Sequence, residues 1–103
     1  MIQDLIDALN GTKLKFAHFG WSHAPKGDYG VYSEAMGHYL RADDKSAEKS
    51  VEYTVDYFTR NPSGKDIETI EDAFDGIPCA WSLEAVMFEE DSGYVHYVWS
   101  VTV

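Results

Sequence analysis

The side chains that could do chemistry in this 103-residue chain are four histidines, one cysteine and 18 acidic residues. His18 and His23 are near enough in sequence to suggest a metal pair, which His38 or His96 could complete. Metal ligands usually come at close, recognisable spacings such as HExxH or CxxC, whereas these histidines fall on separate predicted segments. We therefore expect structural or surface histidines and no metal site.

The other reactive groups lack the partners that catalysis requires. Cys79 lies between Pro78 and Ala80 with no base or cation assignable beside it, so we expect a buried, inert thiol. The acidic run over residues 89–93 lacks the spaced oxygen ligands of a calcium loop and is typical of a solvated hairpin tip. A functional role for this run would be a rim that touches a partner subunit.

Catalytic sequence motifs are also missing. The chain contains no G-x-S-x-G elbow, no phosphate-binding glycine loop and no dinucleotide fingerprint. Residues 61–65 include Gly-Lys but lack the first glycine at P-loop spacing, and any two of the 18 acids could be paired for glycoside hydrolysis. We therefore predict no enzymatic activity, no catalytic residue and no cofactor.

Length and charge exclude further classes of protein. A chain of this length is typical of one domain, so we expect residues 1–103 to form a single domain. No apolar run is long enough to span a membrane, the N-terminus lacks a secretory signal, and a lone cysteine predicts a reducing compartment. The net charge of −10 argues against binding to nucleic acid or to an acidic membrane, because both interactions depend on Lys and Arg.

The N-terminal part predicts a short helix followed by strands. Apolar residues at positions 2, 5, 6 and 9 form one helical stripe, and Asn10-Gly11 is expected to end it through a left-handed glycine. Alternation predicts a strand over 13–19, and the glycine-rich stretch 20–30 predicts a long loop. Residues 31–42 predict a second strand, kinked or bulged at Gly37.

The middle of the chain predicts a strand and then a second helix. After a polar turn at 43–46, the alternation over 51–58 is the clearest strand pattern in the sequence. Ser63, three residues before Asp66, is a candidate N-cap for an amphipathic helix that Gly76 and Pro78 end.

The C-terminal part predicts a hairpin, and the whole order predicts the fold class. Two alternating runs, 81–88 and 94–103, flank a turn at Asp91-Ser92-Gly93. In the first run, strict alternation puts Trp81, Leu83, Ala85 and Met87 on one face and Phe88 on the other, among polar residues. We expect an α+β fold of order α-β-β-β-α-β-β, with a mainly antiparallel sheet of about five strands and both helices on one face.

Aromatic residues exceed what two short helices can cover. Several lie in or beside the long loop, or on strand faces that otherwise carry polar residues, and the last strand is apolar on both faces. Exposed Trp and Tyr are enriched at protein interfaces. We therefore place subunit or partner contacts on six aromatic residues: Trp21, Tyr29, Tyr32, Phe58, Phe88 and Tyr94.

Several segments together suggest a family. The helical start MIQDLIDAL, the strand VEYTVDYFTR followed by the helix IETIEDAF, and the closing hairpin FEEDSGYVHYVWSVTV resemble small tail proteins of long-tailed bacteriophages and prophages. The resemblance is to the tail terminator or tail-completion family, also described as minor tail or head-tail joining proteins. It covers most of the chain through general patterns, and the loop GWSHAPKGDYG departs from it.

The resemblance implies a non-enzymatic structural subunit. It implies a homo-oligomeric ring, typically a hexamer, that ends the tail tube and contacts the tube protein and the head-tail connector. Such a protein would be in the host cytoplasm before assembly and in the virion tail afterwards. An acidic lumen in this ring would let DNA pass without binding it.

Two other classes of function remain open. A small acidic protein-binding module, such as a DNA mimic or an immunity protein, would need carboxylates ordered on one face at phosphate-like spacing. A small cystatin-like or ferredoxin-like α+β enzyme would need His18, His38 or His96 within hydrogen-bond reach of an acid in a cavity.

Overall fold

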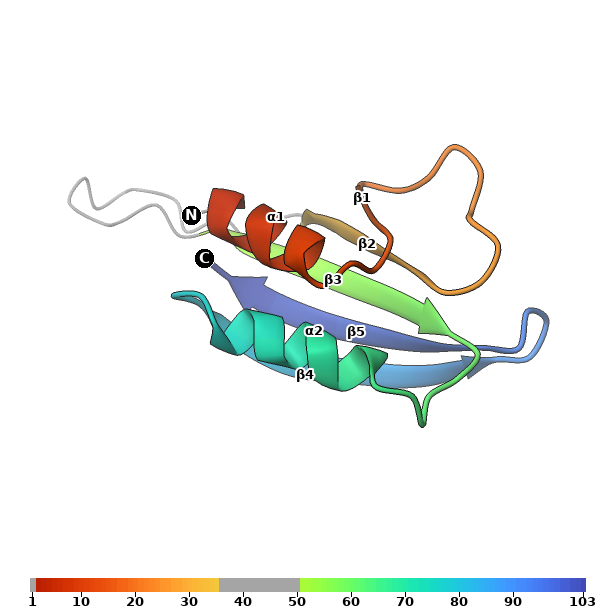
Figure 1. Cartoon of the computed structure of the whole chain (residues 1–103). Coiled ribbons are helices and arrows are strands. Elements are labelled where there is room, and N and C mark those ends of the chain that lie inside the picture. Colours follow the sequence, from red (N-terminus) through yellow and green to blue (C-terminus); the bar gives the residue numbers. More distant parts are fainter. Residues whose placement is uncertain (1, 36–50) are drawn as a thin grey trace.

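A computed structural model describes residues 2–35 and 51–103, which form two helices and one five-stranded sheet (Figure 1). The element order is α-β-β-β-α-β-β, as the sequence predicts. The elements are α1 Ile2–Gly11, β1 Phe16–His18, β2 Tyr29–Glu34, β3 Glu52–Thr59, α2 Asp66–Asp75, β4 Ala80–Glu89 and β5 Tyr94–Thr102. None of the helices in these two ranges has the length and apolar character that crossing a membrane requires.

The sheet has the strand order β1-β2-β3-β5-β4 and is mostly antiparallel. The exception is β1, which lies parallel to β2 with Phe16 opposite Gly30. Two parallel neighbours begin at the same end of the sheet, so the chain must travel back along the sheet between them. The long segment between β1 and β2 makes this return, which a tight hairpin turn cannot do. The order leaves β1 and β4 as the two edge strands.

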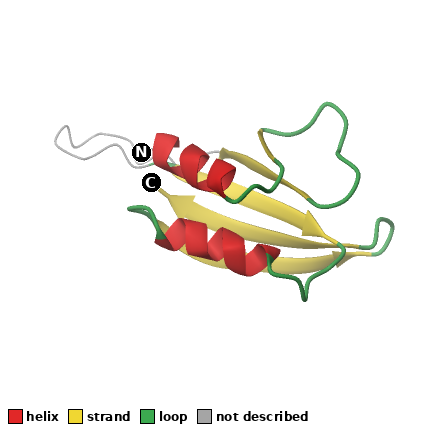
Figure 2. Cartoon of the chain, viewed as in Figure 1, coloured by secondary structure: helices red, strands yellow, loops and turns green. Residues whose placement is uncertain are grey.

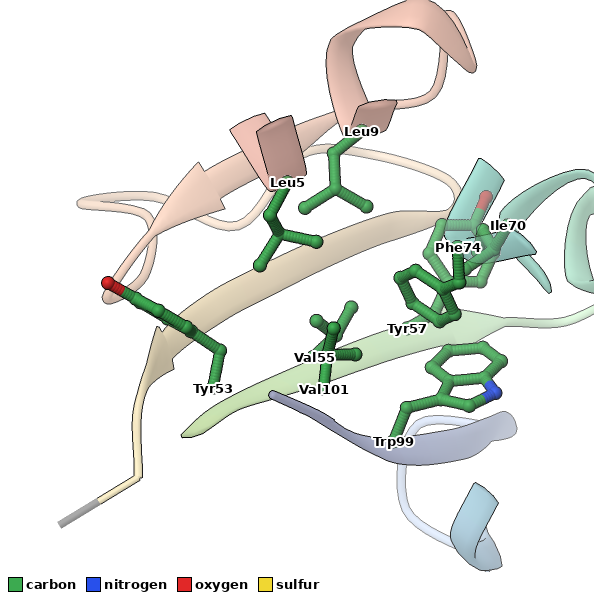
Figure 3. Packing of buried hydrophobic residues seen from close by; sticks show 9 residues of the cluster. All are labelled: Leu5, Leu9, Tyr53, Val55, Tyr57, Ile70, Phe74, Trp99 and Val101. Carbon is green, nitrogen blue, oxygen red and sulfur yellow. The ribbon is translucent and has the colours of Figure 1, made fainter. Parts of the chain in front are cut away.

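Both helices lie on one face of the sheet, as expected (Figure 2). Figure 3 shows side chains from α1 and α2 meeting side chains of β3 and β5 in the core. The core consists of Leu5, Leu9, Tyr53, Val55, Tyr57, Ile70, Phe74, Trp99 and Val101. Burying one such side chain contributes about 1.5–3 kcal/mol, so the helices stabilise the sheet by covering this face.

Strand β3 shows how this cover divides the sheet into two faces. Its buried residues are Tyr53, Val55, Tyr57 and Thr59, and the residues between them are only half-buried. Successive side chains of a strand point to opposite faces. The buried set therefore faces the helices, and the half-buried set belongs to the opposite face.

The ends of four elements differ from the sequence predictions. Gly11 lies within α1, and the left-handed residue is Lys13, with φ 66°, so the predicted strand 13–19 shortens to β1. Ser63 does not cap α2; Lys65 occupies that position without a side-chain cap, and the Ser63 hydroxyl donates to Asn61 Oδ1 instead. Residues 29 and 30, predicted in the loop, begin β2.

Strand β4 departs from strict alternation. A β-bulge between Leu83 and Ala85 leaves Glu84 without an opposite residue in β5. A bulge inserts one extra residue and so reverses the alternation beyond it. Phe88 therefore faces the same side as Trp81 and Leu83, and the prediction that it shares a face with Ser82 is wrong. The predicted features at Gly37, His38 and residues 43–46 lie outside the described residues.

Candidate interaction surface

The sheet face opposite the helices, called the open face below, is covered by no described helix (Figure 2). The strand register places its residues in rows that cross the sheet. One row near the β4–β5 turn contains Tyr29, Phe58, His96 and Met87, and we call it the aromatic row. A second row further along contains Ser33, Thr54, Ser100 and Ser82, and we call it the hydroxyl row.

The rings of the aromatic row stack on one another across three strands. The Tyr29 and Phe58 ring centroids lie 4.8 Å apart at 19°, and those of Phe58 and His96 lie 4.1 Å apart at 21°. Tyr94 meets Tyr29 edge-on at 5.6 Å and Phe58 at 6.1 Å. Cross-strand aromatic pairs contribute roughly 0.2–1 kcal/mol each. Because the faces are used in stacking, the rings present mainly their edges outward.

Two carboxylates flank the imidazole of His96. Its Nε2 lies 2.7 Å from Asp56 Oδ2, and its Nδ1 lies 3.4 Å from Glu89 Oε2. Both nitrogens donate to these acceptors at once only in the doubly protonated ring. A general base needs one nitrogen free to meet a substrate, so this arrangement favours a structural role for His96 over a catalytic one.

Tyr94 joins the aromatic row to the long loop. Its hydroxyl donates to the Gly27 carbonyl at 2.6 Å, and the Arg60 guanidinium lies 4.1 Å from its ring centroid. Asp28 adds a second link, because its Oδ2 accepts a 2.7 Å hydrogen bond from the Thr59 hydroxyl. These two hydrogen bonds fix the end of the loop beside the row. Burial at this position raises the pKa of the Tyr29 hydroxyl, and the nearby Tyr94 and Glu89 raise it further.

The most exposed large apolar side chains lie at the two edges of the sheet. Beside β1, Phe19 is 69% exposed and Trp21 is 36% exposed, although the Trp21 indole donates to the Gly30 carbonyl. Along β4, the exposed large hydrophobic residues are Leu83, Val86, Met87 and Phe88. These six are all the exposed large hydrophobic residues within ranges 2–35 and 51–103.

A second histidine–carboxylate pair lies at the β1 edge. His18 Nε2 is 2.7 Å from Glu34 Oε1, and the imidazole stacks on Phe19 at 4.1 Å and on Tyr32 at 4.9 Å. The hydrogen bond from His18 lowers the pKa of the Glu34 carboxyl. The alternative function predicted from sequence, a small α+β enzyme, requires a histidine within hydrogen-bond reach of an acid. Two such pairs are present, at His18 and at His96.

The remaining candidate groups show no sign of reactivity. Cys79 is half-buried, its thiol donates to the Phe74 carbonyl at 3.3 Å, and burial raises its pKa, which lowers the fraction of reactive thiolate. His23 is exposed in the loop and belongs to neither histidine–carboxylate pair. Within the described part of the chain, no cluster of His, Cys, Asp and Glu could hold a metal ion.

The structure brings together three of the six residues predicted as contacts. Tyr29, Phe58 and Tyr94 form one cluster on the open face. The other three make no ring contact with this cluster or with one another: Tyr32 stacks on His18, Trp21 lies in the loop, and Phe88 lies on β4.

Sequence reasoning missed four exposed apolar residues: Phe19, Leu83, Val86 and Met87. Alternation predicts them only as strand residues, because alternation alone does not reveal which strand is an edge. For Leu83, Val86 and Met87 the available signal is that residues 80–88 carry apolar side chains on both faces of a predicted strand.

A comparison with models of known protein families and with curated proteins found no match to this chain.

Proposed function

We propose that this chain is a non-enzymatic structural subunit of a phage or prophage tail. In this proposal, copies of the chain form a ring that ends the tail tube and joins it to the head. The subunit is in the host cytoplasm before assembly and in the virion tail afterwards. Its partners are further copies of itself, the tail tube protein and the head-tail connector.

The observation that carries the proposal is the aromatic row on the open face. Phe58 stacks on Tyr29 and on His96, and no described helix lies over these rings. Tyr94 meets Tyr29 and Phe58 edge-on and supports them from a buried position, with 8% of its surface exposed. A rigid group of aromatic side chains on an uncovered sheet is typical of a protein interface, because it offers apolar area at little entropic cost. The resemblance to tail proteins names the partner, and we assign this row to the tail tube.

The charge of the chain is compatible with this role. A net charge of −10 disfavours tight binding of DNA, which must pass through a tail without being retained. Stopping growth of the tube requires only that the ring occupy its end, so the function depends on shape and contact area and needs no catalytic group. The two carboxylates around His96 are in keeping with such a structural site.

The proposal is tested by removing the gene for this chain from the phage or prophage that carries it. Electron micrographs of the mutant should show overlong tubes without heads, and supplying the wild-type chain should restore tails of normal length. The double variant Tyr29→Ser with Phe58→Ser should fail to restore them, because it removes the aromatic row.

A matched control changes the same two strands on the same face. The variant Ser33→Ala with Thr54→Ala alters the hydroxyl row and should restore normal tails. Circular dichroism must first show that both double variants are folded. Normal, head-bearing tails in the absence of the gene would overturn the proposed function.

A further inference from the structure

The two edges of the sheet differ in charge as well as in position. Beside β1, residues 11–30 contain three lysines and one acid. On the β4 edge, the strand and its turn, residues 80–93, contain four acids and no Lys or Arg. The lysines beside β1 are Lys13, Lys15 and Lys26, all of them exposed and without an ion pair to any described residue.

Each edge combines its charge with exposed apolar side chains. At the β1 edge, Phe19 and Trp21 accompany the three lysines. At the β4 edge, Leu83, Val86 and Phe88 accompany Glu84 and the acidic turn at 89–91. In Figure 1 these edges lie on opposite sides of the molecule, and the β4–β5 hairpin extends beyond the N-terminal end of α2.

We propose that the β4 edge of one copy docks on the β1 edge of the next copy, so that subunits join head to tail. This inference rests on the proposed function and specifies its contact between neighbouring subunits. The apolar residues of the two edges cover one another, and lysines of one copy face acids of the other. A head-to-tail contact that uses two different patches closes into a ring when the rotation between subunits allows it.

The same charges disfavour the alternative two-fold contact. Pairing two β4 edges would bring Glu84 and residues 89–91 of both copies together, and pairing two β1 edges would do the same for the lysines. Like charges placed opposite each other at an interface cost several kcal/mol. Of the three possible contacts between these two edges, the one between unlike edges avoids that cost.

Edge strands normally carry features that prevent such association. Strand β1 has three residues, whereas β4 has ten, and β4 carries its charges mainly at the bulge and at the turn. A long apolar edge strand with unpaired backbone groups is a template for association. Docking against a neighbouring copy covers this exposed edge.

The test reverses the charge of one edge at a time in the full chain. The β1-reversed variant carries Lys13→Glu, Lys15→Glu and Lys26→Glu; the β4-reversed variant carries Glu84→Lys, Glu90→Lys and Asp91→Lys. Assembly is followed by sedimentation velocity up to millimolar concentration. Each variant alone should need about tenfold or more protein to assemble than the wild type. An equal mixture should assemble again, because both of its junctions then pair opposite charges.

A control and a second pair of variants separate the possible outcomes. The control variant carries Asp7→Lys, Glu68→Lys and Asp72→Lys on the helices. It changes the net charge as much as the β4-reversed variant does and should leave assembly unchanged. Phe19→Asn and Phe88→Ser, one at each edge, should each block assembly, yet their mixture should give dimers, because one intact junction remains.

Three results would overturn the inference. They are a wild-type chain that stays monomeric throughout the concentration series, a β1-reversed variant that assembles like the wild type, and a mixture of reversed variants that does not assemble. If such a result accompanies overlong tubes in the gene deletion, the edge contact is wrong and the proposed function stands. If the deletion instead gives normal tails, the function is wrong.

Discussion

The two faces of the sheet are built from the same strands but have different environments. On β5, Val101 is fully buried beneath the helices, whereas Val98 on the open face is only half-buried. On β3, Val55 and Phe58 show the same contrast. The two residues of each pair lie three positions apart on one strand and point to opposite faces, so the helix cover distinguishes them. Stability is therefore concentrated on one face, and the other face is available for contacts.

The largest expected effect compares two valines on one strand. Val101→Ala should lower the free energy of unfolding by about 2–3 kcal/mol, because it leaves a cavity beneath the helices. Val98→Ala removes the same atoms from the open face and should cost about 1 kcal/mol or less. Urea denaturation of both variants measures the difference. Equal losses would mean that the open face is as well covered as the core.

A second prediction concerns how tightly the covered face packs at the β1 edge. A Cβ atom on Gly30 would collide with the ring of Phe16, so Gly30→Ala should cost about 1–3 kcal/mol. In a Phe16→Ala background the ring is absent, and the same change should cost much less. A double-mutant cycle measured by thermal unfolding gives the coupling. Additive costs would show that Phe16 does not occupy this space in solution.

The smallest expected effect is a dependence on alkaline pH. Tyr57 is buried beneath α2 and its hydroxyl donates to Asp66 Oδ2 at 2.7 Å; burial and this acid raise the pKa of Tyr57 well above its ordinary value of 10.0. A raised folded-state pKa stabilises the fold fully below the ordinary value, and that stabilisation is lost as the pH rises above it. Unfolding should therefore become easier above about pH 10.

The variant Tyr57→Phe tests this assignment. It should lose about 1 kcal/mol at neutral pH with the hydrogen bond, and it should show a weaker loss of stability at alkaline pH. Tyr29, whose pKa is also raised, would account for the part that remains. Denaturation midpoints from pH 8 to pH 11 give the comparison. Parallel curves for variant and wild type would exclude Tyr57 as the responsible group.

The elements could be predicted from sequence where periodicity is regular. The stripe of α1, the alternation of β3 and the turn at 91–93 each depend on neighbours within a few residues, and all three are present. The bulge beside Glu84 could not be predicted, because its position depends on pairing with β5. The N-cap predicted for α2 is wrong for a local reason: the Ser63 hydroxyl donates to Asn61, two residues before it, and not to the helix.

The candidate interaction surface also combines features that the sequence predicts with features that only the fold shows. Residue types alone identified Tyr29, Phe58 and Tyr94 as aromatic residues outside the predicted core. Their contact depends on the register of β2, β3 and β5, which brings Tyr29 and Tyr94 into one cluster although they are 65 positions apart in the sequence. The exposure of Leu83, Val86 and Phe88 depends on β4 being an edge strand.

The sequence by itself determined the order of elements, the excess of negative charge and the supply of aromatic side chains, because these follow from composition and from spacing along the chain. The tertiary structure alone decided which strand lies at each edge, which face the helices cover, and which charges share an edge. These are decided by contacts between distant residues, whose free energy depends on strand pairing and packing and leaves no local pattern in the sequence.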